Sequence, residues 1–287
     1  MPELPEVETL CRQLNTVLPG EKILRIEVLD SRLGNMARKR IDSDILFSGT
    51  VPAGSGMEKI MMLVGRRVST VTRKGKGIHI QLDDGLTAAL HLRMSGRLLY
   101  LAGDVPTPSK IFPYSRMVIG FSSGTLVLID PRRFATFDVQ PEGVAPLLPD
   151  DPMKGLPAPR LRKIAAARRR PVKSFLMDQK IIAGIGNIYA SEILFAAGID
   201  PRRPACSLTM AEWRKVATAT RAILCRAVNC RGTTISDWRD LFGRSGTNQD
   251  HLEAYSRQGK PCRRCGGIIE RIDQGGRGTW VCSMCQR

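Results

Sequence analysis

Residues 78–92 read IHIQLDDGLTAALHL, and this stretch decides the fold class of the first half of the chain. Apolar residues alternate with polar or small ones on both sides of a turn at Asp83-Asp84-Gly85. Alternation with a period of two is the pattern of a half-buried strand, and Asp-Gly is a typical hairpin turn. The stretch therefore predicts an antiparallel β-hairpin.

The same pattern recurs further along the chain, where residues 117–121 and 126–128 alternate around a turn at Ser122-Ser123-Gly124. Upstream, residues 7–18 carry apolar side chains at helical spacing, and Pro19-Gly20 ends that helix. Residues 1–140 are therefore expected to form an antiparallel β-sandwich with a flanking helix at its N-terminus.

The rest of the chain has a different character. Residues 141–160 contain six prolines and predict an interdomain linker. Residues 161–250 follow a helical pattern, most clearly over 211–228, and residues 251–287 form a cysteine-containing end. The chain is thus expected to be an α+β multidomain protein, with a β-sandwich, a helical domain and a small terminal module.

The terminal module carries four cysteines as two Cys-x2-Cys pairs separated by sixteen residues, namely Cys262, Cys265, Cys282 and Cys285. This spacing is typical of a tetrahedral zinc site. Gly275-Gly276 predicts the turn of a hairpin whose second strand includes residues 279–281. Two disulfides are the alternative, but they need an oxidising compartment, and the chain opens without a signal segment. We therefore expect one zinc ion.

The chain begins Met-Pro-Glu-Leu-Pro-Glu, which places an imino acid and two carboxylates together. Removal of Met1 would leave Pro2 with a secondary amine, and an α-amino group has a pKa near ~8. Such an amine can form a Schiff base with a sugar, and Glu3 and Glu6 can supply acid–base groups. The simpler alternative is an ordinary helix start, where proline and glutamate are common.

Positive charge is concentrated in the second half of the chain. The net charge is +17; residues 1–159 contribute +3 of it and residues 160–287 contribute +14. This asymmetry is typical of a protein that binds a phosphate backbone. A membrane surface is less well supported, because neither an apolar run of spanning length nor an amphipathic anchor is apparent in the sequence.

Three sequence motifs and the cysteine module together indicate one family. They are PELPEVET at residues 2–9, DPRRF at residues 130–134 and GIGNIYASE at residues 184–192, followed by the cysteine module. In this order they resemble bacterial formamidopyrimidine-DNA glycosylases, which excise 8-oxoguanine and ring-opened purines. DPRRF and Leu4 favour this branch over the related endonuclease VIII branch, which removes oxidised pyrimidines. The resemblance implies a helix–two-turn–helix element within 161–250 and damaged double-stranded DNA as the partner of a monomeric enzyme.

The resemblance also implies a mechanism. Pro2 attacks C1′ of the damaged nucleotide, displaces the base and holds the sugar as a Schiff base. Glu3 protonates the opening sugar ring, while Glu6 orders the N-terminus and the pocket. Lys76 matches the catalytic lysine near the lesion phosphate, with Lys74 as a competing assignment and a solvated loop charge as the simple alternative. Successive β- and δ-elimination then cut the strand on both sides of the sugar.

Extruding a nucleotide from the duplex leaves a gap that inserted side chains can fill. The resemblance assigns this role to Met94, Arg132 and Phe134, with Arg132 facing the orphaned cytosine. Met and Phe are more often core residues, so burial at a strand end is the alternative.

Other residues are expected to contact DNA phosphates. Asn187 follows a Gly-x-Gly turn that opens a predicted helix over 188–197, and helix N-termini bind phosphate through free amides. The resemblance adds Lys173, His91 and Arg277, the last as the finger arginine that grips phosphates flanking the lesion. The zinc ion is then structural, since four thiolates leave it no open position.

The chain departs from the family pattern in two places. Near residues 241–250, where the family loop covers a flipped 8-oxoguanine, Gly246-Thr247-Asn248 stands where an aromatic residue is expected after glycine. A Gly/Ser/Pro-rich stretch at 48–56 lengthens the chain, and we expect a surface loop there. Two alternatives stay open: a glycosylase for oxidised pyrimidines, and a non-catalytic damaged-DNA-binding protein. A bacterial cytoplasmic location at the nucleoid is expected.

Overall fold

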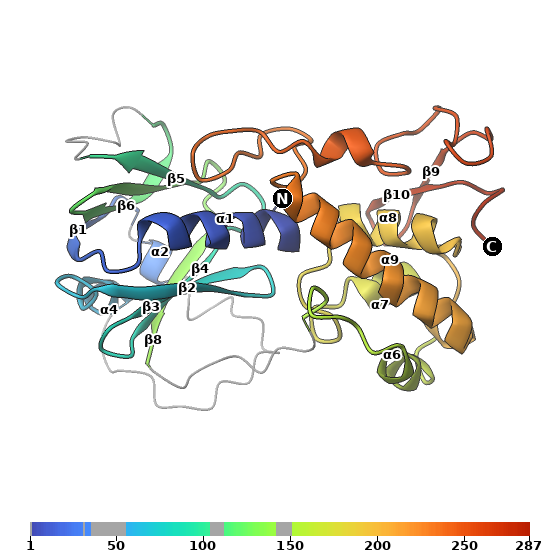
Figure 1. The fold of residues 1–287 in the computed structure, drawn as a ribbon, viewed down its shortest axis with the longest axis horizontal. Helices are drawn as coiled ribbons and strands as arrows, with labels where there is room; N and C mark the ends of the chain where they lie inside the picture. The colour runs from blue at the N-terminus through green and yellow to red at the C-terminus, as the bar shows by residue number, and fades with distance from the viewer. Residues whose placement is uncertain (1, 31, 36–55, 104–111, 142–150) are drawn as a thin grey trace. The chain divides into compact units, whose positions relative to one another are not determined.

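The structure, a computed structural model, describes residues 2–30, 32–35, 56–103, 112–141 and 151–287 (Figure 1). Two compact units are present. The first consists of residues 1–2, 6–148 and 234–246, and the second of residues 3–5, 149–233 and 247–287. The chain therefore crosses between the units more than once, and each unit is described by itself below.

The first unit is built on two four-stranded antiparallel sheets. One has the order β1-β6-β7-β5 and the other the order β2-β3-β4-β8. The strands are β1 (Ile23–Val28), β2 (Val68–Lys74), β3 (Gly77–Leu82), β4 (Thr87–His91), β5 (Arg97–Ala102), β6 (Ser115–Phe121), β7 (Gly124–Ile129) and β8 (Thr136–Gln140). The predicted hairpin over 78–92 is confirmed as β3 and β4, paired with Ile80 opposite Ala88.

One apolar core holds both sheets together. It gathers buried residues from strands of each sheet and from α1 (Leu4–Val17), among them Leu14, Ile78 and Met117. The predicted helix over 7–18 is confirmed, although it begins earlier, at Leu4. Two short helices, α2 (Arg32–Asn35) and α4 (Gly56–Met61), complete the described part of this sandwich.

The segment 234–246 belongs to the sandwich through its contacts, although it follows the helices in sequence. Trp238 and Leu241 are buried in the sandwich core. Gln13 on α1 clamps the segment, because its side chain donates to Asp240 at 2.9 Å and accepts from the Leu241 amide at 2.9 Å. Burial of Trp238 and Leu241 in the sandwich core, together with the hydrogen bonds to Gln13, explains why this segment belongs to the β domain.

The second unit is helical around its own apolar core. Its helices are α6 (Ala158–Ala165), α7 (Val172–Leu176), α8 (Asn187–Ala197) and α9 (Met210–Asn229), with short 3₁₀ turns at Ala205–Ser207 and Asn248–His251. The predicted helices over 188–197 and 211–228 are confirmed as α8 and α9. Helix α9 begins with a capping box between Thr209 and Glu212, and Gly198 ends α8 with a φ of 72°.

The chain ends in a two-stranded hairpin within the second unit, formed by β9 (Glu270–Asp273) and β10 (Gly278–Val281). Gly275 and Gly276 lie in the turn with φ values of 61° and 71°, a left-handed region that favours glycine. The predicted hairpin with its Gly-Gly turn is confirmed.

Two expected features lie wholly or partly outside the described residues: nearly all of the stretch 48–56, and residues 142–150 of the proline-rich linker. Among the helices that the structure describes, none is both long and apolar enough to cross a bilayer.

Candidate active site and zinc centre

Glu3 is held at the N-terminus of α8 within the second unit. One carboxylate oxygen accepts a hydrogen bond from the Gly186 amide at 2.7 Å, and the other accepts one from the Ile188 amide at 2.9 Å. The Glu3 side chain is almost fully buried. Free amides at a helix start are natural partners for a carboxylate. The start of α8 therefore holds the carboxylate of Glu3, the residue that directly follows Pro2 in the chain.

Gly186 makes this arrangement possible because of its size. A Cβ atom at Gly186 would lie 2.3 Å from the Glu3 carboxylate carbon. The backbone of Gly186 is extended, with a φ of −129°, so space and not conformation demands glycine there. Nearby, Gly184 has a φ of 103° and accepts a hydrogen bond from the Leu4 amide at 3.0 Å. The Gly-x-Gly turn thus shapes the contact between the N-terminal segment and α8.

Lys173 joins two helices to the terminal hairpin. Its buried ammonium donates to the Asn187 side-chain oxygen at 2.6 Å, to the Thr279 hydroxyl at 2.6 Å and to the Gly278 carbonyl at 3.2 Å. Burial lowers the pKa of Lys173 to about 8, and the nearby charge of Arg277 adds to this effect. Since these three acceptors match the three protons of an ammonium, a phosphate contact by Lys173 would have to displace one of them.

Asn187 and Arg277 lie close to this junction. The Asn187 amide nitrogen donates to the Gly278 carbonyl at 3.1 Å, so both ends of its side chain are engaged within the unit. Arg277 is exposed at the start of β10. An exposed cation on a hairpin turn can reach a phosphate, as expected from the sequence, while Asn187 serves the packing of the unit as well.

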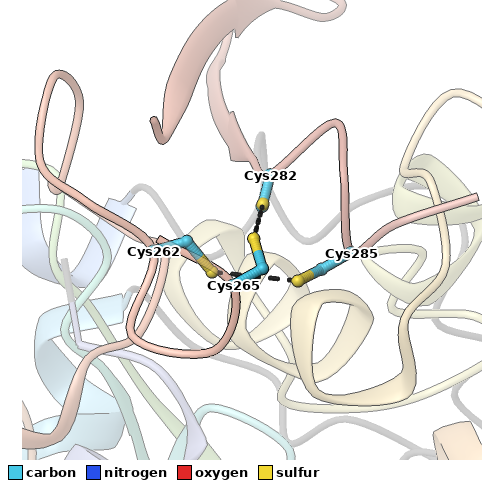
Figure 2. A group of neighbouring side chains, drawn as sticks. All are labelled: Cys262, Cys265, Cys282 and Cys285. Atoms are coloured by element: carbon cyan, nitrogen blue, oxygen red, sulfur yellow. Dashed lines mark hydrogen bonds between the residues drawn. The ribbon is translucent and has the colours of Figure 1, made fainter. Parts of the chain in front are cut away.

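The four cysteines of the terminal module form a cluster whose sulfur atoms all lie within 4.8 Å of one another (Figure 2). The sulfurs of Cys262 and Cys285 are 3.8 Å apart, and those of Cys265 and Cys282 are 3.5 Å apart. A tetrahedron with Zn–S bonds of about 2.3 Å has edges of roughly 3.8 Å. These four residues therefore fit one zinc ion.

The thiols of the cluster differ in their electrostatics. Burial and the neighbouring thiols raise the pKa of Cys282, and they raise that of Cys285 to about 12. Burial raises the pKa of Cys262, but backbone amides of Cys265 and Arg264 that point at its sulfur bring it down to about 7. Zinc binds the thiolate form. With four thiolate ligands the ion is structural, and it holds the hairpin in its fold.

In the first unit, the structure brings Lys76 and His91 close together. Gly77, next to Lys76, pairs with His91 across β3 and β4. Burial, helped by the charges of Arg93 and Lys76, lowers the pKa of His91 to about 3. The His91 Nδ1 accepts a hydrogen bond from the Arg93 amide at 3.0 Å, which assigns the proton to Nε2. His91 is thus a neutral side chain with one N–H to donate.

The three residues assigned to the gap lie on two loops of the sandwich. Met94 is 47% exposed, which is unusual for a core residue and fits a side chain that contacts a ligand. Arg132 is exposed and its guanidinium lies 5.0 Å from the centre of the half-buried Phe134 ring. Pro2 and Glu6, in the same unit, are buried.

The segment near 241–250, where the sequence departs from the family pattern, is well anchored. Asp240, just before it, is fully buried and accepts hydrogen bonds from the amides of Phe242 and Arg244. Asn248 is also fully buried and donates to the Thr233 hydroxyl at 2.8 Å. Asn248 is therefore held inside the unit, whereas Thr247, directly after Gly246, is exposed. The effect of this departure from the family pattern on lesion preference stays a prediction.

Several residues at these sites escaped the sequence-based assignment. Asp130 stands within the DPRRF motif and Ser95 directly follows Met94, but neither had an assigned role. Together they connect the loops of Met94 and Phe134. Tyr255, whose ring packs on Trp280 at a centroid distance of 4.2 Å, had no sequence signal at all. The available hint was the pair Asp130-Pro131, since an aspartate at a turn often accepts from backbone amides nearby.

Comparison with known proteins agrees with this architecture. Residues 1–137 match the formamidopyrimidine-DNA glycosylase N-terminal domain, residues 148–238 match the H2TH domain of the same enzymes, and residues 259–287 match a zinc finger found in FPG and IleRS. These three matches follow one another along nearly the whole chain.

Curated relatives and solved structures extend the likeness. The chain is 39% identical to the formamidopyrimidine-DNA glycosylase of Roseiflexus sp., covering all of both chains, and 39% identical to that of Moorella thermoacetica, covering 95% of this chain and 94% of that one. A complex of a mutant Lactococcus lactis FPG with Fapy-dG-containing DNA superposes with a TM-score of 0.84, at 26% identity over both complete chains. A complex of the wild-type Lactococcus lactis enzyme with DNA containing an oxidised pyrimidine does so with the same score, identity and coverage. With its domain order, its N-terminal motif and its four-cysteine module, the chain belongs to the formamidopyrimidine-DNA glycosylase family.

Proposed function

We propose that this base-excision repair glycosylase is bifunctional, with Pro2 as its nucleophile and an AP lyase activity that follows base removal. The observation that carries the proposal is the fixed position of Glu3, whose carboxylate accepts from two amides at the start of α8. The peptide bond joins this anchored acid to Pro2, so the amine and the acid act on the same sugar.

The steps follow from the chemistry of the two groups. The Pro2 nitrogen forms a bond to C1′ as the damaged base leaves with the pair of electrons of its bond to C1′. The proton that the nitrogen loses passes to the Glu3 carboxylate, which gives it to the ring oxygen as the sugar opens and the iminium forms. The resulting iminium acidifies the C2′ proton. Loss of that proton breaks the C3′–O bond, and a second elimination breaks the C5′–O bond. Lys76 assists near the lesion phosphate.

The DNA contacts are divided between the units. Met94, Arg132 and Phe134 fill the space left by the extruded nucleotide, whereas His91, Lys173, Asn187 and Arg277 serve the phosphate backbone. The neutral His91 Nε2–H suits a single hydrogen bond to a phosphate oxygen. We also propose that the protein acts in the bacterial cytoplasm, at the nucleoid.

Oxidised purines are the proposed substrates, and oxidised pyrimidines are the second candidate. The second candidate is favoured by one observation: the Lactococcus lactis relative has been seen with DNA containing an oxidised pyrimidine. The absence of the expected aromatic residue at Thr247-Asn248 also makes lesion preference a question for measurement.

Borohydride trapping tests the proposal. Protein confirmed to begin at Pro2 is incubated with a duplex carrying 8-oxoguanine opposite cytosine, and in parallel with a dihydrouracil duplex. We expect a covalent adduct on the purine lesion, and none with Pro2→Thr or with protein that retains Met1. An adduct only on dihydrouracil would support the pyrimidine substrate. Duplex binding without any adduct would support a non-catalytic damaged-DNA-binding protein.

A further inference from the structure

Two neighbouring loops of the sandwich carry the residues assigned to the gap in the duplex. One joins β4 to β5 and carries Met94; the other joins β7 to β8 and carries Arg132 and Phe134. The flanking strands pair with one another, since β4 pairs with β8 and β5 pairs with β7. Both loops therefore cross from one sheet to the other at the same end of the sandwich.

A single buried carboxylate connects these two loops. Asp130, fully buried where β7 ends, accepts a hydrogen bond from the Ser95 hydroxyl at 2.5 Å. The same side chain accepts from the backbone of its own loop, at 2.6 Å from the Phe134 amide and 2.7 Å from the Ala135 amide. Ser95 directly follows Met94. The Asp130 side chain therefore binds the backbone of its own loop and also binds the loop that carries Met94.

The negative charge of Asp130 is balanced inside the sandwich. The guanidinium of Arg116, which is 2% exposed, lies 3.7 Å from Asp130 and 3.0 Å from Asp30. Asp30 in turn lies 3.5 Å from the guanidinium of Arg133, on the exposed side of the second loop. A buried carboxylate is tolerated when it is paired and hydrogen-bonded in this way.

The backbone of both loops is held in an uncommon conformation. Arg93 and Arg133 have φ values of 55° and 59°, in the left-handed region that non-glycine residues seldom adopt. Such conformations persist when surrounding contacts enforce them, and they cluster where a ligand is gripped. Around Arg133, Asp130 supplies such contacts through the amides of Arg132 and Phe134. The Arg93 amide donates to His91 Nδ1 at 3.0 Å.

We propose that Asp130 and Ser95 are positioning residues that couple the two loops into one preordered wedge, so that Met94, Arg132 and Phe134 enter the duplex together. This inference rests on the proposed function. Its physical basis is preorganisation, because loops that are already ordered lose little conformational entropy when they insert. The coupling acts on nucleotide extrusion and on reading of the opposite base, and not on the eliminations.

The test removes the hydroxyl that joins the loops. For Ser95→Ala we expect single-turnover excision of 8-oxoguanine to slow by about tenfold, because a hydrogen bond to a charged group is lost. Cleavage at a preformed abasic site, which needs no base removal, should change by no more than about twofold. Fluorescence of 2-aminopurine placed beside the lesion should report slower insertion, and Ser95→Thr should restore all three signals.

Ser122→Ala is the matched control. The Ser122 hydroxyl also donates to a carboxylate in the same unit, that of Glu21, at 2.5 Å. Ser122 lies in the β6–β7 turn, before β7 begins, whereas Asp130 follows the end of β7. Ser122→Ala should behave as the unaltered protein. The coupling is overturned if Ser95→Ala leaves excision and insertion unchanged, or if excision and abasic-site cleavage fall together, since that marks general structural damage.

A double-mutant cycle adds an independent measurement. Met94→Ala and Phe134→Ala should show non-additive effects on insertion in the unaltered background and additive effects once Ser95→Ala is present. Additivity in both backgrounds contradicts the coupling. If the unaltered protein cuts no substrate, the proposed function is wrong. The 2-aminopurine fluorescence on bound DNA then still shows whether the two loops insert together.

Discussion

Single residues at the start of α8 show how little space the proposed catalytic acid, Glu3, has. Glu3 receives two backbone amides there, and the absence of a side chain at Gly186 leaves room for its carboxylate. Two backbone amides thus help to position this carboxylate. A methyl group at Gly186 would force the carboxylate to move, because the amides cannot retreat without unwinding the first turn of the helix.

Gly186→Ala tests this argument. The added methyl group must push the Glu3 carboxylate away from the two amides, and a displacement of about 1 Å in a reacting group can reduce a rate by ~10²-fold. We expect such a loss in single-turnover excision, with zinc content unchanged.

Gly198→Ala provides the control, because Gly198 has a φ of 72° at the other end of α8, and a Cβ there would meet the Cys285 carbonyl oxygen at 3.3 Å and no atom of Glu3. It should lower the free energy of unfolding by about 1 kcal/mol, from backbone strain, and keep activity. Full activity in Gly186→Ala would contradict this argument, because it would show that the Glu3 carboxylate can act from a second position.

At the scale of elements, the zinc hairpin is fastened to the helices by a buried lysine. Lys173 on α7 joins Asn187 on α8 to Thr279 on β10. The hairpin itself has only four residues in each strand, which is too few to be stable without the metal. We therefore expect metal binding to determine whether Arg277, the proposed phosphate contact, is held in place.

Cys282→Ala should lose the zinc ion and with it the ordered hairpin. We expect roughly tenfold weaker binding to an abasic-analogue duplex, since a lost charge-assisted contact to phosphate is worth about 1.5–3 kcal/mol. Metal analysis and fluorescence anisotropy measure the two effects. Cys206→Ala, at an exposed cysteine outside the hairpin, should change neither. Unchanged affinity in metal-free protein would mean that the hairpin is dispensable.

At the scale of the whole molecule, stability depends on histidines that the fold keeps neutral. Burial, with the nearby charge of Lys74, lowers the pKa of His79 to about 4, and the pKa of His91 is lowered to about 3. Both values lie below the ordinary value of 6.5. The unfolded chain therefore binds these protons first as the pH falls.

The sandwich should accordingly be most stable above pH 6.5 and lose stability as the pH falls from there towards 4. Each histidine contributes a slope of about 1.4 kcal/mol per pH unit in this range. Urea unfolding between about pH 5 and 7, above the ordinary range of carboxylates, measures it. His79→Gln should make the dependence of the unfolding free energy on pH shallower by the contribution of one histidine, about 1.4 kcal/mol per pH unit. Substitution of the exposed His251 serves as the control. A slope that His79→Gln leaves unchanged would contradict the assignment.

Much of the molecule was predictable from the sequence because the signals were local. The alternation over 78–92 predicted β3 and β4, and the apolar spacing over 211–228 predicted α9, since period and burial are coupled in both elements. The cysteine spacing predicted the metal cluster, because two short knuckles can bring their own ligands together.

The sequence by itself determined the element types, the zinc ligands and the family, all of which depend on spacings within a few residues or on long ordered motifs. Only the tertiary structure decided which distant groups meet. Asp130 and Ser95 are 35 positions apart, Glu3 and Gly186 are 183 apart, and Lys173 and Thr279 are 106 apart. Segment 234–246 lies on the sandwich for the same reason, since buried contacts between residues remote in sequence follow from packing and leave no periodic pattern in the chain.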